Sequence, residues 1–120
     1  MKCLKHISIL FIAVLALLLL MPPKADAATV ASGTCGDNLT WVLDDSGKLI
    51  ISGNGTMENW TSGSAPWYSN RSSIKMVVIG NDVTTIGDYA FDFCGGLTWV
   101  TIGNSVTTIG RSAFRFCGNL

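Results

Sequence analysis

Apolar and polar side chains alternate in two short stretches of the chain, residues 74–79 and 97–102. Each stretch reads apolar-x-x-Val-x-Ile. Alternation with a period of two is typical of a half-buried strand whose β-branched residues face inward. Residues 83–86 and 106–109 each run from valine to isoleucine and predict a second short extended piece after each strand.

From residue 77 onward the chain is one pattern written twice. Residues 77–97 and 100–120 align at an offset of 23 residues, and 15 of their 21 aligned positions are identical. A period of about 20 to 50 residues is typical of a solenoid, in which each repeat is one rung stacked on the next. The repeats therefore predict a mainly β solenoid.

Each repeat closes with alanine, phenylalanine and cysteine at helical spacing. These residues are Ala90, Phe91 and Cys94 in the first repeat and Ala113, Phe114 and Cys117 in the second. Such spacing predicts about one helical turn. The expected fold class is thus a repeat solenoid, mainly β with short helical turns.

A β-hairpin is predicted ahead of the repeats. Residues 39–43 and 48–52 read as strands, and residues 44–47 form the turn between them. Aspartate and serine favour the early positions of such a turn, and Gly47 can take a positive φ at its end. The hairpin is expected to form an N-terminal cap on the repeats.

Between the hairpin and the repeats, residues 53–73 are rich in glycine, serine, asparagine and threonine. So many turn formers predict irregular structure. Trp60, Trp67 and Tyr68 lie within this segment and indicate that it is packed. Residues 65–68 could open one short helical turn.

The N-terminus has the features of a secretory signal peptide. A basic start precedes an apolar run over residues 7–21, and two prolines and a small-x-small site follow. The run is shorter than the roughly 18 to 20 residues that a transmembrane helix needs, although an uncleaved membrane anchor is an alternative. The expected organisation is a signal peptide at 1–27, a cap segment at 28–73 and repeats at 74–120, incomplete at the C-terminus.

Charge and histidine content narrow the possible functions. After residue 27 the chain has five basic and seven acidic residues. It offers no basic patch for nucleic acid and no lysine run for anionic membranes. The only histidine, His6, lies in the predicted signal peptide. The mature chain therefore lacks a histidine-activated nucleophile and a histidine ligand for zinc. We expect no catalytic residues, no metal and no cofactor.

The cysteines and the acidic turn admit more than one interpretation. Cys94 and Cys117 occupy equivalent positions, so they could be stacked buried thiols, a disulfide, or reactive or metal-bound groups. Cys35 is a third, well-separated cysteine. Asp44 and Asp45 suit turn chemistry better than calcium binding, because neighbouring side chains in a hairpin turn point apart.

Opposite charges fall at equivalent positions of the two repeats. Asp88 aligns with Arg111, and Asp92 aligns with Arg115. Stacked rungs would bring each acid next to a base. We predict that at least one of these pairs lies within salt-bridge distance.

The repeat pattern I-G-N-x-V-T-T-I-G-x-x-A-F-x-x-C-x-x-L resembles the BspA-like leucine-rich repeats of bacterial surface proteins. The preceding segment, with Ser32-Gly33-Thr34-Cys35-Gly36, the hairpin and Ala65-Pro66-Trp67-Tyr68, resembles the N-terminal segment that often precedes such repeats. The resemblance implies a leucine-rich-repeat-like fold with a β-hairpin cap. It also implies a secreted or surface-bound protein that adheres to host or neighbouring-cell proteins.

One exposed strand face is the candidate binding surface. Trp99 stands between inward-facing residues, and its counterpart one repeat earlier is Met76. Tryptophan is enriched at binding hot spots, although Trp99 could instead pack on the cap or a neighbouring rung. The candidate binding residues are Lys75, Met76, Val78, Thr98, Trp99 and Thr101.

The last repeat lacks the strand that should follow it, since Leu120 aligns with Leu97. We therefore expect a chain cut from a longer protein, and possible self-association through the open C-terminal rung. The favoured function is a non-catalytic secreted or cell-surface binding or adhesion module of a bacterium. The alternatives are the N-terminal module of a larger surface enzyme and an architectural stalk.

Overall fold

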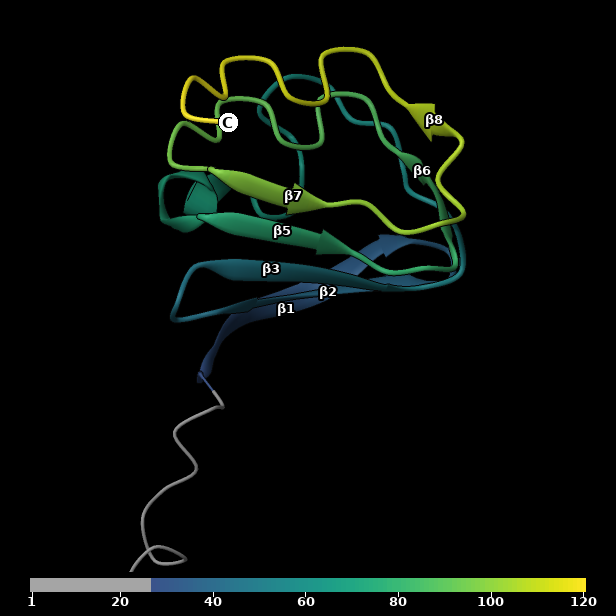
Figure 1. Cartoon of the computed structure of the whole chain (residues 1–120), viewed down its shortest axis with the longest axis horizontal. Helices are drawn as coiled ribbons and strands as arrows, with labels where there is room; N and C mark the ends of the chain where they lie inside the picture. The colour runs from purple at the N-terminus through teal and green to yellow at the C-terminus, as the bar shows by residue number, and fades with distance from the viewer. Residues whose placement is uncertain (1–26) are drawn as a thin grey trace, which may run out of the picture.

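The computed structural model describes residues 27–120 and is mainly β. Two sheets meet at an angle, and irregular turns form a third side (Figure 1). One sheet has five strands in the order β1-β2-β3-β5-β7, and the other has three in the order β4-β6-β8. The strands are β1 (Thr29–Gly36), β2 (Leu39–Asp44), β3 (Lys48–Gly53), β4 (Gly55–Thr56), β5 (Met76–Ile79), β6 (Val83–Ile86), β7 (Trp99–Thr101) and β8 (Thr108–Ile109).

The first three strands are antiparallel and include the predicted hairpin. β2 pairs with β3, and β1, which the sequence did not predict, pairs with the other edge of β2. Asp44 Oδ1 fixes the turn by accepting hydrogen bonds from the backbone N–H groups of Ser46 (2.9 Å) and Lys48 (3.1 Å). Gly47 has a φ of 88°, as the turn requires. The hairpin prediction is confirmed, and Asp44 serves as a turn residue.

The strands of the repeats pair in parallel at the predicted offset. In the five-stranded sheet Met76 faces Trp99, and in the three-stranded sheet Thr85 faces Thr108. Both pairs are one 23-residue period apart. β3 precedes them as a parallel partner of β5, with Lys48 opposite Met76. The hairpin is therefore hydrogen-bonded directly to the first repeat.

The predicted helical turn at the end of each repeat is wrong. Tyr89 and Phe93 have φ values of 55° and 62°, a left-handed conformation that interrupts an α-helix. Successive turns form instead, and backbone bonds join the two repeats, such as Phe91 N–H to the carbonyl of Ala113 at 2.7 Å. The helix in the described residues is η1, a 3₁₀ helix at Tyr68–Ser73. It begins at the segment where the sequence suggested a helical turn.

The core contains a column of aromatic rings that runs from the cap into the repeats. Trp67 stacks on Phe91 with 5.3 Å between ring centroids, and Phe91 stacks on Phe114 at the same distance. Trp41 and Trp60 meet Trp67 edge-on. The column joins the irregular segment to both repeats and explains why that segment is packed.

Within residues 27–120 no helix is both long and apolar enough to cross a membrane. The predicted signal peptide at 1–27 lies almost wholly outside the described residues.

Candidate interaction surface

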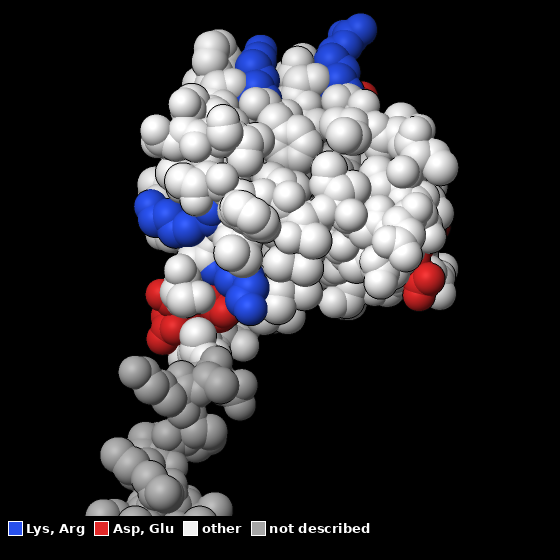
Figure 2. Space-filling model, viewed as in Figure 1, with Lys and Arg blue, Asp and Glu red and all other residues white. Residues whose placement is uncertain are grey.

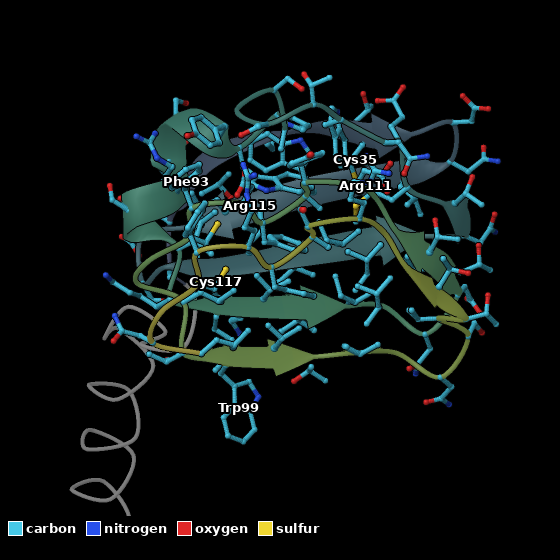
Figure 3. All side chains as sticks on the ribbon, turned by 90° about the horizontal axis from the view of Figure 1, so that it is seen from above. Cys35, Phe93, Trp99, Arg111, Arg115 and Cys117 are labelled. Carbon is cyan, nitrogen blue, oxygen red and sulfur yellow. The ribbon has the colours of Figure 1, made fainter. Side chains whose placement is uncertain are left out.

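The outer face of the five-stranded sheet carries large apolar side chains. Alternation along β5 buries Val77 and Ile79 and leaves Met76 36% exposed. Trp99, the partner of Met76 on β7, is 60% exposed. Figure 3 shows Trp99 projecting away from the sheet. Trp99 therefore belongs to the surface and is not packed into the cap or a neighbouring rung.

The outward-facing positions form rows across the strands. Lys48, Met76 and Trp99 are register partners on β3, β5 and β7. A second row consists of Val42, Ile50, Val78 and Thr101. In Figure 2, which views the molecule as in Figure 1, charged residues lie mainly around the edge of a largely uncharged face. We name the seven residues of these two rows the sheet-face patch.

Four of the six predicted binding residues fall on this patch: Met76, Val78, Trp99 and Thr101. Lys75 and Thr98 each lie one residue before a strand, β5 and β7 respectively. Because side chains alternate between the two faces along a strand, they do not point to the face that carries Met76 and Trp99. The Lys75 ammonium donates to the Ser72 carbonyl at 3.2 Å, and the Thr98 hydroxyl donates to the Lys75 carbonyl at 3.3 Å. These two residues flank the patch and do not share its face.

Two residues of the hairpin also belong to the patch, and the sequence did not predict this. Val42 and Ile50 extend the second row onto β2 and β3. Their alternation within the predicted strands was visible in the sequence, but their alignment with the repeats was not. Ile50 lies 28 residues before its partner Val78, whereas the repeats are offset by 23.

The indole of Trp99 is held in place along its strand. Its Nε1–H donates to the hydroxyl of Thr101 at 3.1 Å. The hydrogen bond reduces the freedom of an exposed ring, so less conformational entropy is lost when a partner covers it. An exposed but restrained tryptophan is well suited to act as an anchor for a binding partner.

Equivalent residues of the two repeats show whether a side chain is exposed by its own orientation or by the lack of a neighbouring rung. Ile86 is 1% exposed, whereas its equivalent Ile109 in the last repeat is 51% exposed. The same side chain is therefore core when a rung covers it. Met76 behaves differently, because it remains exposed although β3 and β7 flank its strand.

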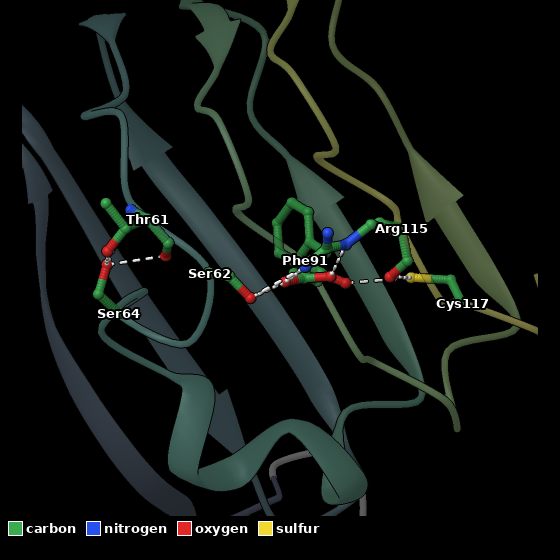
Figure 4. A network of polar contacts seen from close by, with 7 residues as sticks. Thr61, Ser62, Ser64, Phe91, Arg115 and Cys117 are labelled. Carbon is green, nitrogen blue, oxygen red and sulfur yellow. Dashed lines mark hydrogen bonds and ion pairs between the residues drawn. The ribbon is translucent and has the colours of Figure 1, made fainter.

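A polar network joins the cap to both repeats (Figure 4). Arg115 Nη2 lies 2.9 Å from the buried Asp92 Oδ2, which confirms the prediction that at least one aligned pair forms a salt bridge. The Ser62 hydroxyl donates to the same carboxylate at 2.6 Å. At the other aligned pair the Asp88 carboxylate accepts from the backbone N–H of Arg111 at 2.7 Å.

Opposing effects set the charge state of Asp92. Burial disfavours the carboxylate and raises its pKa, but hydrogen bonds from Arg115 and Ser62 outweigh burial and hold the pKa below its usual range. The pKa of Arg115 is raised, chiefly by its hydrogen bond to Asp92. Both groups are therefore charged at neutral pH, and the network is structural.

The three described cysteines are free thiols. Burial, followed by the charge of Glu58, raises the pKa of Cys35 to about 12. Burial and then the nearby Cys117 thiol raise the pKa of Cys94 to about 12. Cys117 Sγ lies 3.0 Å from the Phe91 carbonyl oxygen, to which it donates. In residues 27–120 no group of three histidine, cysteine or acidic side chains could hold a metal ion.

Comparison with known proteins identifies the repeats. A sequence profile described as a BspA type leucine rich repeat region matches residues 62–120. These are BspA-type leucine-rich repeats. The resemblance seen in the sequence is thereby confirmed, and a leucine-rich repeat region indicates a protein-interaction module. Leucine-rich repeats are generally non-catalytic.

A solved structure extends the similarity over more of the chain than the profile matches. A leucine-rich repeat protein from Eubacterium ventriosum ATCC 27560 is 39% identical, with a TM-score of 0.65 over 70% of this chain. The alignment covers 23% of that protein, so the present chain spans less than a quarter of its length. No curated protein matches the chain.

Proposed function

We propose that the chain is a non-catalytic protein-binding module whose partner docks on the sheet-face patch. The observation that carries the proposal is the 60% exposure of Trp99 beside Met76 on the outer face of the five-stranded sheet. Tryptophan is enriched among residues that dominate binding energy, and the apolar members of the surrounding rows would exclude water from its contact. The general use of leucine-rich repeats in protein–protein binding supports the same function.

A cellular setting for this module follows from its N-terminus and its repeats. We propose a bacterial protein that is secreted or held at the cell surface and that adheres to a host or neighbouring-cell protein. The predicted signal peptide and the family of the repeats support this placement. The rungs would continue as a solenoid, since parallel strands already stack with a constant 23-residue offset.

A second proposal concerns larger assemblies. The chain spans 23% of a similar solved protein, which supports a role as the N-terminal module of a larger surface protein, an enzyme included.

The exposed Ile102 and Ile109 of the last repeat support self-association through that rung when nothing else covers it.

The test compares substitutions on and beside the patch. Immobilised fibronectin, laminin and collagen serve as probes, and binding is measured by surface plasmon resonance. Trp99→Ala is expected to weaken binding by about 30-fold or more, which corresponds to a hot spot of about 2 kcal/mol. Thr98→Ala, one residue away and off the patch, is the matched control. If the unchanged chain binds a probe and Trp99→Ala binds it equally well, the sheet-face patch is not the interface.

A further inference from the structure

Strand β1 lies at one edge of the five-stranded sheet. It pairs with β2 on one side and is the first strand in the order β1-β2-β3-β5-β7 (Figure 1). An edge strand presents backbone N–H and C=O groups to which another strand can form hydrogen bonds. β1 has eight residues, whereas the other three edge strands, β4, β7 and β8, have two, three and two. β1 is therefore the longest sheet edge in the part of the chain that the structure describes.

β1 has few of the features that prevent edge strands from pairing. Soluble proteins protect such edges with charged side chains, prolines, bulges or very short strands. The sequence of β1, TVASGTCG, contains no charged residue and no proline. The register with β2 shifts near both ends of β1, but residues 31–34 pair without a shift. Ser32, Gly33 and Thr34 in this regular part are exposed, and the neighbouring Val30 is 55% exposed.

Contacts within the molecule limit the open part of this edge to residues 29–34. The Cys35 carbonyl accepts a hydrogen bond from the N–H of Glu58 at 2.9 Å, so the segment after β4 covers the end of β1. At the start of the strand, the Ala28 carbonyl accepts from the N–H of Asp45 at 2.9 Å, which holds β1 against the hairpin. The open stretch between these contacts is as long as an average strand of about 5 to 6 residues.

The properties of this edge favour a second copy of the same strand as its partner. Two identical strands can pair antiparallel around a two-fold axis, which gives each copy the same contacts. An axis near Ser32 would bring small, uncharged side chains together, and these neither repel nor crowd one another. β2 already holds β1 extended in each copy, so pairing orders less backbone than the binding of a free peptide would. We propose that two copies of the chain pair through residues 29–34 of β1 and form one continuous sheet.

Pairing through β1 would place two sheet-face patches on one side of the assembly. The two-fold axis of such an antiparallel junction is perpendicular to the sheet, so the same face of each copy points in the same direction. β1 and β7 are opposite ends of the sheet, so Trp99 of each copy stays far from the junction. The pair would bind two partner sites at once, which raises avidity without any new contact. This consequence rests on the proposed function, whereas the pairing itself does not.

The test measures self-association of the full chain by sedimentation velocity. Every protein carries Ile109→Lys, which removes the other proposed self-association site, and this protein is the parent. Ser32→Lys with Thr34→Lys adds two positive charges to the edge, and the corresponding glutamate substitutions add two negative charges. Thr40→Lys with Ser52→Lys is the matched control, because these exposed residues share the same face on the interior strands β2 and β3.

The parent is expected to form dimers. The lysine and glutamate variants should each dimerise about tenfold more weakly, because like charges meet across the axis. A mixture of the two variants should form a one-to-one dimer again, and the control should dimerise as the parent does. Far-ultraviolet circular dichroism checks that each variant folds.

Three results would overturn the proposal: a monomeric parent, a folded lysine variant that dimerises as tightly as the parent, or a mixture that stays monomeric. Loss of the dimer on Trp99→Ala would also overturn it, because the interface would then be the sheet-face patch. The outcome does not depend on any probe protein. If no probe binds the patch, the sheet-face proposal fails while sedimentation still decides the pairing of β1.

Discussion

Burial determines the chemistry of the cysteines. Cys35 and Cys94 lie in the core, and burial raises the pKa of each to about 12. The thiolate is the reactive form of cysteine, and almost none of it exists at neutral pH when the pKa is so high. The equivalent positions of Cys94 and Cys117 therefore provide packing, with both thiols free.

We predict that Cys35 and Cys94 resist alkylation by iodoacetamide at pH 8 until the chain is unfolded by urea. Site-resolved mass spectrometry of native and unfolded samples measures this directly. Rapid labelling of Cys94 in the native chain would show that the thiol is more accessible than the structure indicates.

The same pKa shifts predict the effect of high pH on stability. An unfolded thiol begins to ionise near its ordinary pKa of 9.0, whereas folded Cys94 remains protonated up to about 12. The stability associated with the protonated thiol is therefore complete below pH 9 and is lost as the pH rises toward 12. Thermal melts between these limits should show a shallower decline in Tm for Cys94→Ala than for the unchanged chain.

At the scale of elements, periodicity predicted the strands but not the turns. β5 and β7 lie within the predicted ranges because alternation with a period of two reports burial of one face. The turn segment was misread because alanine, phenylalanine and cysteine at helical spacing give no sign that Phe93 has a positive φ. Left-handed backbone at a bulky residue has no local sequence signal.

The candidate site was predictable to the same extent. Met76 and Trp99 followed from alternation within the repeats. Val42 and Ile50 did not, because the hairpin joins the repeats with a 28-residue offset that only the folded chain reveals.

The aromatic column gives a prediction about the joint between cap and repeats. Trp67 is fully buried, contacts Phe91, and donates its indole N–H to the Ala90 carbonyl at 2.7 Å. Trp67→Leu is expected to lower the free energy of unfolding by about 3 kcal/mol, from the lost volume and the unsatisfied carbonyl. Urea denaturation measures the change. The control Trp99→Leu should alter stability by less than about 0.5 kcal/mol, because exposed substitutions seldom do more.

The Ser62–Asp92–Arg115 network predicts sensitivity to acid. The folded pKa of Asp92 is lowered, so its contribution to stability is present above the unfolded value of about 3.9 and is lost as the pH falls through the folded value. We expect Asp92→Asn to be less stable than the unchanged chain at pH 7 and to lose less stability below pH 4. Thermal melts at pH 7 and pH 3 compare the two proteins. An equal loss in both would mean that other carboxylates dominate acid unfolding.

At the scale of the whole molecule, Ile86 and Ile109 occupy equivalent positions of the two repeats and differ mainly in whether a further rung covers them. Ile86→Lys would place a charge in the core and is expected to prevent folding, because an unpaired buried charge costs several kcal/mol. Ile109→Lys changes an exposed residue and should leave the fold intact. If the last rung self-associates as proposed, Ile109→Lys should also shift sedimentation toward the monomer. A monomeric unchanged chain at high concentration would contradict the self-association proposal.

Four backbone hydrogen bonds between successive turn segments run in the same direction. The N–H of Trp60 donates to the Asp88 carbonyl, and the N–H of Tyr89 donates to the Arg111 carbonyl. In each bond the earlier segment donates and the later one accepts. This row of bonds therefore has a polarity, because the N–H donors of one turn segment meet the carbonyl acceptors of the next. If two copies of the chain met through their last rungs, face to face, N–H groups would lie opposite N–H groups along this side. Such a symmetric pair must therefore be held by its apolar residues and strand edges. Only a following rung in the same orientation can extend this row of backbone hydrogen bonds.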